Sequence, residues 1–284
     1  MGRKVSEMLL KEGWHVGVAA RRMDALNELA EAFPDRVEVM QIDVMAEEAP
    51  QRLLELINRM GGIDLYFHAS GIGKQNMLLD EEVERKTVMT NALGFTRMVD
   101  TVFTYMADHQ GGHIAVISSI AGTKGLGAAP SYSATKAFQN VYIQSLEQQA
   151  NMRKLPIRFT DIRPGFVDTP LLGDGKKYPL LMNADKVSRE ILQAVHQQRH
   201  VRVIDWRYRL LVPFWRMIPN WLWRRLPIRN CSHPSPLHEE GNCGVLDAHG
   251  EGDTVPPSVY FHHLYLHMLM QVNNLVRIFH ELIG

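Results

Sequence analysis

The sequence predicts an α/β fold in which a doubly wound parallel sheet carries helices on both faces, with a helical extension at the C-terminus. Two observations predict it. Strand-like and helical patterns alternate from the start of the chain to about residue 205. Glycine or proline also ends many of these patterns, as at Gly13, Pro34 and Gly61. Such alternation supplies the helical crossovers that parallel strands require.

The predicted strands are short apolar runs bounded by turn residues. They cover residues 15–20, 37–42, 63–68, 113–117, 157–162 and 201–204. The predicted helices carry apolar side chains at spacings of three and four residues. They cover residues 5–10, 23–33, 50–60, 82–108, 131–151 and 184–198. We therefore interpret residues 1–205 as one domain.

The composition changes after Asp205. Residues 206–225 hold four of the five tryptophans, set among arginines. We interpret 206–229 as a Trp/Arg-rich amphipathic segment and 230–284 as a linker with an apolar helical tail. The amphipathic segment is compatible with a membrane interface, with a position over a substrate pocket, and with contact to a partner subunit.

The composition of the 284 residues argues against several classes of function. The formal net charge is zero, so no overall field favours nucleic acid. Cys231 and Cys243 give no disulfide framework, and together with His233 and His238 they fit no regular zinc spacing, so we predict no metal site. The chain shows no apolar signal core and no run of about 18 uncharged apolar residues. We therefore expect a cytoplasmic protein.

Ser119, Tyr132 and Lys136 are the strongest sign of function. A tyrosine and a lysine four residues apart share one face of a helix, and a serine at the end of the preceding strand can complete the group. A phenol ordinarily titrates near pH ~10, and an ammonium beside it lowers that pKa by favouring the phenolate. The serine hydroxyl can hold a substrate oxygen. The set predicts proton transfer to or from an alcohol or a carbonyl.

These three residues belong to a longer series of motifs. In chain order the series is Asp43 after a strand, His68-Ala69-Ser70-Gly71 after the next, Asn91 in a long helix, Ser119, Tyr132 with Lys136, and Pro164-Gly165 followed by Thr169-Pro170. It resembles the short-chain dehydrogenase/reductase family over about residues 2–205. The resemblance implies a Rossmann-like fold and an oxidoreductase that interconverts an alcohol and a carbonyl with a nicotinamide cofactor.

The resemblance implies four catalytic residues. Tyr132 is then the general acid/base, and Ser119 holds the substrate oxygen. Lys136 binds the nicotinamide ribose and lowers the pKa of Tyr132, while Asn91 completes a proton relay through a water near Lys136. His68 stands where the family has an asparagine, and we interpret it as a tolerated variant.

The resemblance also implies a cofactor site assembled from several turns. Val167 and Thr169 are expected at the nicotinamide carboxamide, and Asp43 near the adenine. The full implied set is Gly2, Asp43, Ala69, Gly71, Tyr132, Lys136, Pro164, Gly165, Val167 and Thr169.

Two arginines determine the expected cofactor. Members of the family that prefer NAD usually carry an acid after the second strand, where this chain has Arg21 and Arg22. Guanidinium groups suit a 2′-phosphate. We predict that both arginines bind the cofactor and that NADP(H) is preferred over NAD(H). The alternative is that they only flank the start of a helix.

The start of the chain departs from the family pattern. The family begins with a strand and a Thr-Gly-x-x-x-Gly-x-Gly turn, of which only Gly2 has a counterpart here. We therefore expect the strands at 15–20 and 63–68 to lack a shared neighbour, at a cost of about 1–3 kcal/mol for each unpaired buried group. A start codon placed too late or a genuine fragment would explain the difference, and the intact catalytic pattern favours the first.

Three hypotheses about function follow. The first is an NADP(H)-dependent oxidoreductase with Tyr132 as its acid/base. The second is an inactive fragment that acts as a scaffold because its phosphate-binding loop is incomplete. The third is an enzyme that binds a membrane surface through residues 206–225 and acts on a lipid-like substrate. The resemblance also implies a homodimer or homotetramer, formed through the helices around Asn91 and after Tyr132.

Overall fold

The computed structural model describes residues 1–169, 172, 178–226 and 228. The predictions for residues 230–284, including those for Cys231 and Cys243, lie outside the described residues. The chain divides into two compact units, and the first contains residues Met1–Pro219. The described part of the second unit contains one short helix, α9 (Asn220–Trp223). The fold and the candidate site below belong to the first unit.

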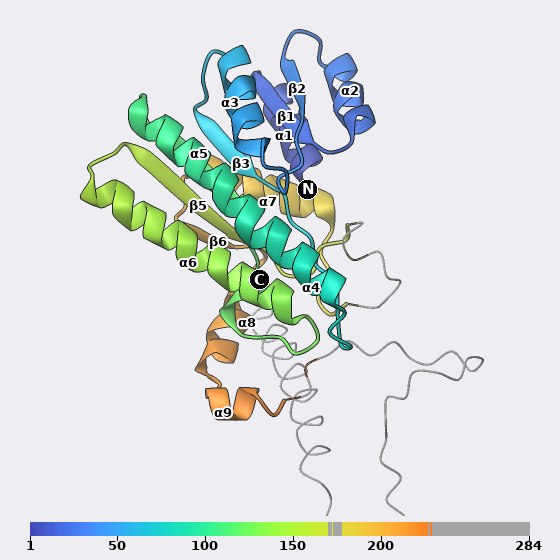
Figure 1. Ribbon diagram of the computed structural model, residues 1–284. Helices are drawn as coiled ribbons and strands as arrows, with labels where there is room; N and C mark the ends of the chain where they lie inside the picture. Colours follow the sequence, from blue (N-terminus) through green and yellow to red (C-terminus); the bar gives the residue numbers. More distant parts are fainter. Residues whose placement is uncertain (170–171, 173–177, 227, 229–284) are drawn as a thin grey trace, which may run out of the picture. The chain divides into compact units, whose positions relative to one another are not determined.

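The described strands are all parallel, but they form two sheets (Figure 1). β1 (Val16–Ala20) pairs with β2 (Val37–Gln41). The second sheet has the order β3-β4-β5-β6, with β3 (Leu65–His68), β4 (Gly112–Ile117), β5 (Ile157–Arg163) and β6 (Val201–Val203). Parallel strands covered by helices confirm the predicted α/β class.

As the sequence predicted, β1 and β3 share no neighbouring strand among the described residues. Val16 donates to Arg36 beside β2, and His113 of β4 donates to Asp64 at the start of β3. Because successive residues of a strand direct their backbone groups to alternate sides, Gly17 and Phe67 turn theirs away from these paired strands. The break in the ladder therefore lies between β1 and β3.

Helices cover both faces of the strands (Figure 1). On one face α3, α5 and α6 pack around Phe95, Ile114 and Phe159. On the other face α1, α7 and α8 pack around Ile162 and Ile191. The helices of this unit are α1 (Gly2–Lys11), α2 (Met23–Ala32), α3 (Ala49–Arg59), α4 (Glu81–Val88), α5 (Phe95–Asp108), α6 (Pro130–Met152), α7 (Ala184–His196) and α8 (Trp206–Met217).

The predicted long helix at 82–108 differs in one respect. A π-helical segment, Met89–Gly94, separates α4 from α5, and it contains Asn91. Wider turns of this kind often occur at functional sites. A Cβ on Gly94 would lie 2.7 Å from the carbonyl oxygen of Val44, so only glycine permits this close approach of the two segments.

Helix α8 joins the same compact unit as residues 1–205. Its Tyr208 and Val212 are buried in the core that α1 and α7 share. The Trp/Arg-rich segment therefore contributes packing to this unit as well as an exposed face. None of the helices in the described part of the chain is long and apolar enough to span a membrane.

Candidate active site

Ser119, Tyr132 and Lys136, three of the four predicted catalytic residues, converge at the carboxyl end of β4. Ser119 lies just beyond this strand and caps the short 3-10 helix η2 (Ile120–Thr123), because its Oγ accepts a hydrogen bond of 3.1 Å from the Ala121 amide. Tyr132 lies in the first turn of α6, which Pro130 helps to start. The Ser119 side chain is close enough to the Tyr132 hydroxyl to act on its pKa. The geometry therefore joins the two groups that the sequence placed thirteen residues apart.

The ionisation of Tyr132 differs from the prediction. We expected Lys136 to lower the pKa of this phenol, but burial raises the pKa, and the Ser119 side chain opposes that rise. The Lys136 Nζ lies 5.9 Å from the centroid of the Tyr132 ring. The cost of burying a phenolate therefore outweighs the attraction of the nearby Lys136 ammonium, and Tyr132 is a protonated acid at neutral pH.

Lys136 is a buried cation with its own set of partners. Only 4% of the residue is exposed, and its Nζ donates to the Ile117 carbonyl at 3.1 Å and to Gln139 Oε1 at 2.9 Å. Burial lowers the pKa of Lys136 to about 8, against the opposing effect of Asp161. This ammonium is thus held by acceptors from β4 and from its own helix.

Beneath Lys136 lies a second buried charged group. Asp161 of β5 accepts a hydrogen bond from Ser118, and its Oδ2 pairs with Arg163 Nη2 at 2.6 Å. Burial raises the pKa of Asp161, while Arg163, Ser118 and Lys136 oppose that rise. Ser118 therefore fixes this carboxylate, whereas its neighbour Ser119 acts on the pKa of Tyr132.

Asn91 links the loop after β3 to helix α6. Its side-chain amide donates to the Ile72 carbonyl at 2.7 Å and accepts from the Ile72 amide at 2.9 Å. It also donates to Thr135 Oγ1 at 3.2 Å, and Gln139 Nε2 donates to the Asn91 carbonyl at 2.8 Å. These bonds are not local to its own helix turn, so Asn91 fixes the loop that faces Lys136.

Two glycines support the site, and sequence reasoning did not give them these roles. A Cβ on Gly73 would lie 2.4 Å from Cδ2 of Tyr132, and one on Gly165 would lie 2.2 Å from Cζ of Tyr208. Each glycine therefore allows an aromatic ring to lie against the backbone. Sequence reasoning also missed Gln139, since no motif marks the residue that joins Lys136 to Asn91.

The turn after β5 is tied to Ser119. The Pro164 carbonyl accepts from the Ile120 amide at 3.2 Å and from Ser119 Oγ at 3.4 Å. The Val167 side chain lies in the core, so this residue could meet a ligand only through its backbone. Its carbonyl already accepts from Thr169 Oγ1 at 3.3 Å. The structure thus brings Pro164 and Gly165 to the catalytic set.

The loop after β3 brings together residues that the sequence predicted for the cofactor. A Cβ on Gly71 would lie 3.4 Å from Asn91 Oδ1 and 3.5 Å from Lys136 Nζ. Gly2 opens α1, and a Cβ there would lie 3.1 Å from Cβ of Ala69. The amino end of α1 therefore meets this loop, which suits an anion because amides at a helix start are unpaired donors.

His68 has a structural environment. It is buried, and its Nδ1 lies 2.9 Å from the Tyr66 hydroxyl. Burial lowers the pKa of His68 to about 3, and the nearby Lys136 adds to this. The ring is therefore neutral at physiological pH, which agrees with its interpretation as a tolerated variant.

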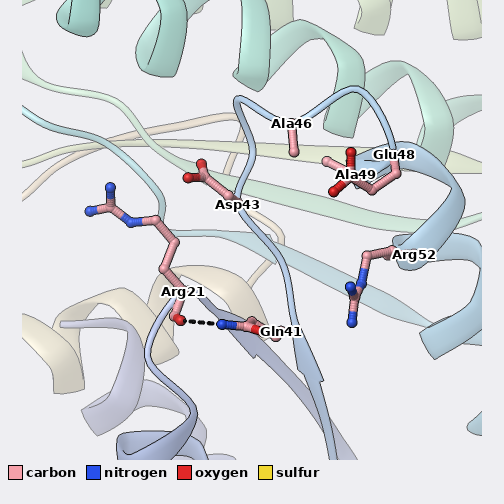
Figure 2. A pocket seen from close by; sticks show the side chains of 7 residues that line it. All are labelled: Arg21, Gln41, Asp43, Ala46, Glu48, Ala49 and Arg52. Atoms are coloured by element: carbon pink, nitrogen blue, oxygen red, sulfur yellow. Dashed lines mark hydrogen bonds between the residues drawn. The ribbon is translucent and has the colours of Figure 1, made fainter.

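A pocket of about 200 Å³ lies at the carboxyl end of the β1–β2 pair (Figure 2). Arg21 from the end of β1 and Arg52 from α3 lie on opposite sides of it, with Asp43 between them. Within the described residues the Arg21 guanidinium forms no ion pair, and Arg52 Nε is buried without a hydrogen-bond partner. The full lining is Arg21, Gln41, Asp43, Ala46, Glu48, Ala49 and Arg52.

The pocket separates the two predicted arginines. Arg21 lines it, and the Arg21 carbonyl accepts from Gln41 Nε2 at 3.0 Å. Arg22 does not line it and instead occupies the N-cap position of α2. Arg52 is the second cation of this pocket, and sequence reasoning missed it because it lies in a helix thirty residues later.

Comparisons with known proteins agree with this geometry. A family model described as "short chain dehydrogenase" matches residues 1–177. An uncharacterized oxidoreductase of Myxococcus xanthus is 33% identical over 177 residues, which are 60% of this chain and 69% of that protein. Among solved structures, serine dehydrogenase from Escherichia coli has a TM-score of 0.62 at 23% identity, covering 72% of this chain and 91% of its own. ElxO, solved with NADP bound, has a TM-score of 0.64 at 21% identity, covering 74% and 94%.

Proposed function

Because the chain belongs to the short-chain dehydrogenase family of NAD(P)-dependent oxidoreductases, we propose that it interconverts an alcohol and a carbonyl with NADP(H). Tyr132 is the general acid/base of this reaction. The observation that carries the proposal is the convergence of two groups on Tyr132: the Ser119 side chain, which acts to lower the pKa of the phenol, and the Lys136 ammonium, 5.9 Å from the centroid of the tyrosine ring.

The residues present fit an NADP(H) molecule at both of its ends. At the adenosine end, Arg21 and Arg52 line one pocket, and a 2′-phosphate would satisfy the buried Nε of Arg52. At the nicotinamide end, Lys136 would hold the ribose hydroxyls beside Tyr132. NADP bound to ElxO, a structure with the same fold, supports the choice of cofactor. When bound, the cofactor supplies or accepts a hydride at the reacting carbon.

The side chains then provide the proton chemistry. In the direction of reduction, the Tyr132 hydroxyl gives its proton to the carbonyl oxygen as negative charge develops there. The Ser119 hydroxyl exchanges its long bond to the Pro164 carbonyl, 3.4 Å, for a bond to the same substrate oxygen. Because burial keeps Tyr132 protonated, the resting site is prepared for reduction.

Lys136 and Asn91 prepare the site for the next turnover. The ammonium stabilises the phenolate that Tyr132 becomes after it has donated its proton. Asn91 fixes the loop at Ile72 and, through Gln139, the position of Lys136. Reprotonation of Tyr132 follows through a water held near this group, as the family resemblance implies.

The test is the oxidation of NADPH by the full chain with a panel of aldehydes and ketones. Tyr132→Phe is expected to lower turnover by about 10²–10⁴-fold while its affinity for NADPH stays unchanged. Tyr105→Phe is the matched control, since this tyrosine of α5 stacks on His109 away from the site. A Tyr132→Phe protein that reduces the same substrate at the wild-type rate would show that another group supplies the proton.

A second candidate function is that of a scaffold without catalysis. This function is favoured by the separation of the two sheets in the described residues. The pocket at Arg21 belongs to the β1–β2 pair, whereas the catalytic residues follow strands of the other sheet. A folded chain with no saturable response to NADPH would support this function. A saturable response would exclude it.

We also propose a homodimer or homotetramer through α4, η1 (Met89–Gly94) and α6. Five large apolar side chains of these elements are exposed: Val88, Leu93, Phe138 and Val141, and Met152 at the far end of α6. In sedimentation velocity, Val141→Glu is expected to shift the protein toward monomer. Met152→Glu, at the far end of α6, is the control and should leave the oligomer intact. An oligomer that survives Val141→Glu would place the interface elsewhere.

A further inference from the structure

Helix α8 carries a row of large apolar side chains that the fold leaves exposed. Trp206, Leu210, Phe214 and Met217 are 40%, 49%, 54% and 77% exposed. Their spacing of four, four and three residues places them on one side of the helix. We call these four residues the α8 stripe. Continuous exposed apolar rows are unusual on a soluble surface unless something binds there.

The opposite side of α8 fixes the helix to the catalytic unit. Tyr208 packs on Gly165, and its hydroxyl accepts from the Phe166 amide at 3.3 Å and donates to the Pro179 carbonyl at 3.1 Å. At the end of the helix, Lys124 Nζ donates to the Ile218 carbonyl at 2.9 Å. The stripe is therefore presented by a helix anchored to the turns that follow β4 and β5.

The charge beside the stripe has one sign. Helix α8 contains three arginines and no aspartate, glutamate or lysine, although the whole chain is neutral. Arg209 and Arg216 are exposed, and neither has an ion pair within the described residues. They lie seven residues apart, so they follow one flank of the stripe two turns apart. Arg207, on the other flank, pairs with Asp205.

A second copy of the chain fits this surface poorly. Helix α8 has twelve residues and is about 18 Å long. A single row of side chains on so short a helix is small for a stable interface, which usually buries about 800 Å² on each partner. A two-fold contact through the stripe would also bring Arg209 and Arg216 of both copies together, which is unfavourable. An anionic lipid surface instead accepts the apolar side chains among its acyl chains and pairs its phosphates with the arginines.

We propose that the α8 stripe, with Arg209 and Arg216, docks this protein on the surface of an anionic membrane. The helix lies in the interface and does not cross the bilayer. Because α8 is held to the turns at Gly165 and Lys124, docking brings the candidate active site close to the bilayer. This surface role is independent of the proposed reaction.

The test is co-sedimentation of the full chain with vesicles of phosphatidylcholine alone or mixed with phosphatidylglycerol. Wild-type protein is expected to partition into the mixed vesicles, and binding should fall as salt rises. Leu210→Ser/Phe214→Ser should lower the partition coefficient by about tenfold or more. Arg209→Glu/Arg216→Glu should lower it on the mixed vesicles alone. The control is Met152→Ser/Val201→Ser, which removes two apolar side chains outside α8 that are 77% and 52% exposed.

Three results would overturn the proposal. The first is a wild-type chain that stays in the supernatant with both vesicle types. The second is equal vesicle binding by the wild type and by both α8 variants. The third is an α8 variant that loses an oligomeric state in sedimentation velocity with no change in vesicle binding, because the stripe would then be a contact between copies of the chain. Circular dichroism identifies a variant that fails to fold, and the arginine pair provides the second variant.

Discussion

The catalytic set and the pocket at Arg21 lie in two regions that differ in how their strands are supported. β4 and β5 are central strands of the larger sheet, and nearly all of their residues are buried. β1 pairs only with β2 among the described residues, and Ala19 and Ala20 at its end are exposed. The proton-transfer groups therefore rest on a continuous ladder, whereas the pocket for the adenosine end rests on a two-strand pair.

Because of this difference, proton transfer and cofactor binding should respond separately to substitutions. A two-stranded sheet has little stability of its own and depends on the helices that pack on it, here α1, α2 and α3. The catalytic set is instead fixed by buried hydrogen bonds from three elements. Changes near Tyr132 should alter chemistry with little effect on cofactor affinity, and changes near Arg21 should do the reverse.

The largest effect is expected from the buried charge of the catalytic region. The pKa of Lys136 falls from 10.5 to about 8 in the folded state, so above about pH 8 the unfolded chain binds more protons than the folded one. The stability of the wild type relative to Lys136→Met should therefore rise between about pH 8 and pH 10, by on the order of 3 kcal/mol. Urea unfolding at several pH values measures this difference.

The exposed Lys154 provides the control for that series. Lys154→Met should keep a constant difference from the wild type over the same pH range. If the stability difference between the wild type and Lys136→Met is also constant over this pH range, Lys136 keeps its proton in the folded state. Burial would then not lower the pKa of this lysine in the catalytic region.

The next effect is expected at Gly73. Gly73→Ala places a methyl group 2.4 Å from the Tyr132 ring, which must move, and a displacement of this size costs about 10²-fold in rate. Gly127→Ala is the matched control, since a Cβ there meets no atom within 4 Å. Turnover and NADPH affinity are measured together. A Gly73→Ala enzyme that loses affinity but keeps its rate would contradict the separation of the two regions.

The smallest effect is expected in the β1–β2 region. Arg21→Ala should weaken NADPH binding by about tenfold and leave NADH binding nearly unchanged, because one charged hydrogen bond to the 2′-phosphate is lost. Arg22→Ala serves as the control, since Arg22 does not line the pocket. Equal losses in the two variants, or equal losses for both cofactors, would show that the pocket does not read the 2′-phosphate.

Much of this arrangement could be predicted from the sequence. Apolar periodicity located the strands and helices to within a few residues, because core burial imposes that pattern. The spacing of Tyr132 and Lys136 placed both on one helix, and Ser119 followed a predicted strand. That β1 and β3 share no neighbouring strand in the described part of the chain also followed from motif order, since each motif marks a definite strand.

Contacts that depend on the path of a loop could not be predicted. Gly73 meets the ring of Tyr132 across 59 residues, and Arg52 meets the pocket of Arg21 from another helix. The direction of the Tyr132 pKa was also wrong at the sequence level, because desolvation depends on how many atoms surround a group and leaves no local pattern. The exposure of the α8 stripe likewise depended on which side of the helix packs inward.

The most direct test of the proposed function is a titration of the full chain with NADPH, followed by nicotinamide fluorescence. A saturable change of equal affinity in the wild type and in Tyr132→Phe is expected, with reduction of a carbonyl substrate by the wild type alone. That result would show that the chain binds the cofactor and that Tyr132 supplies the proton. A folded wild-type chain whose signal does not change up to millimolar NADPH would contradict the proposed function.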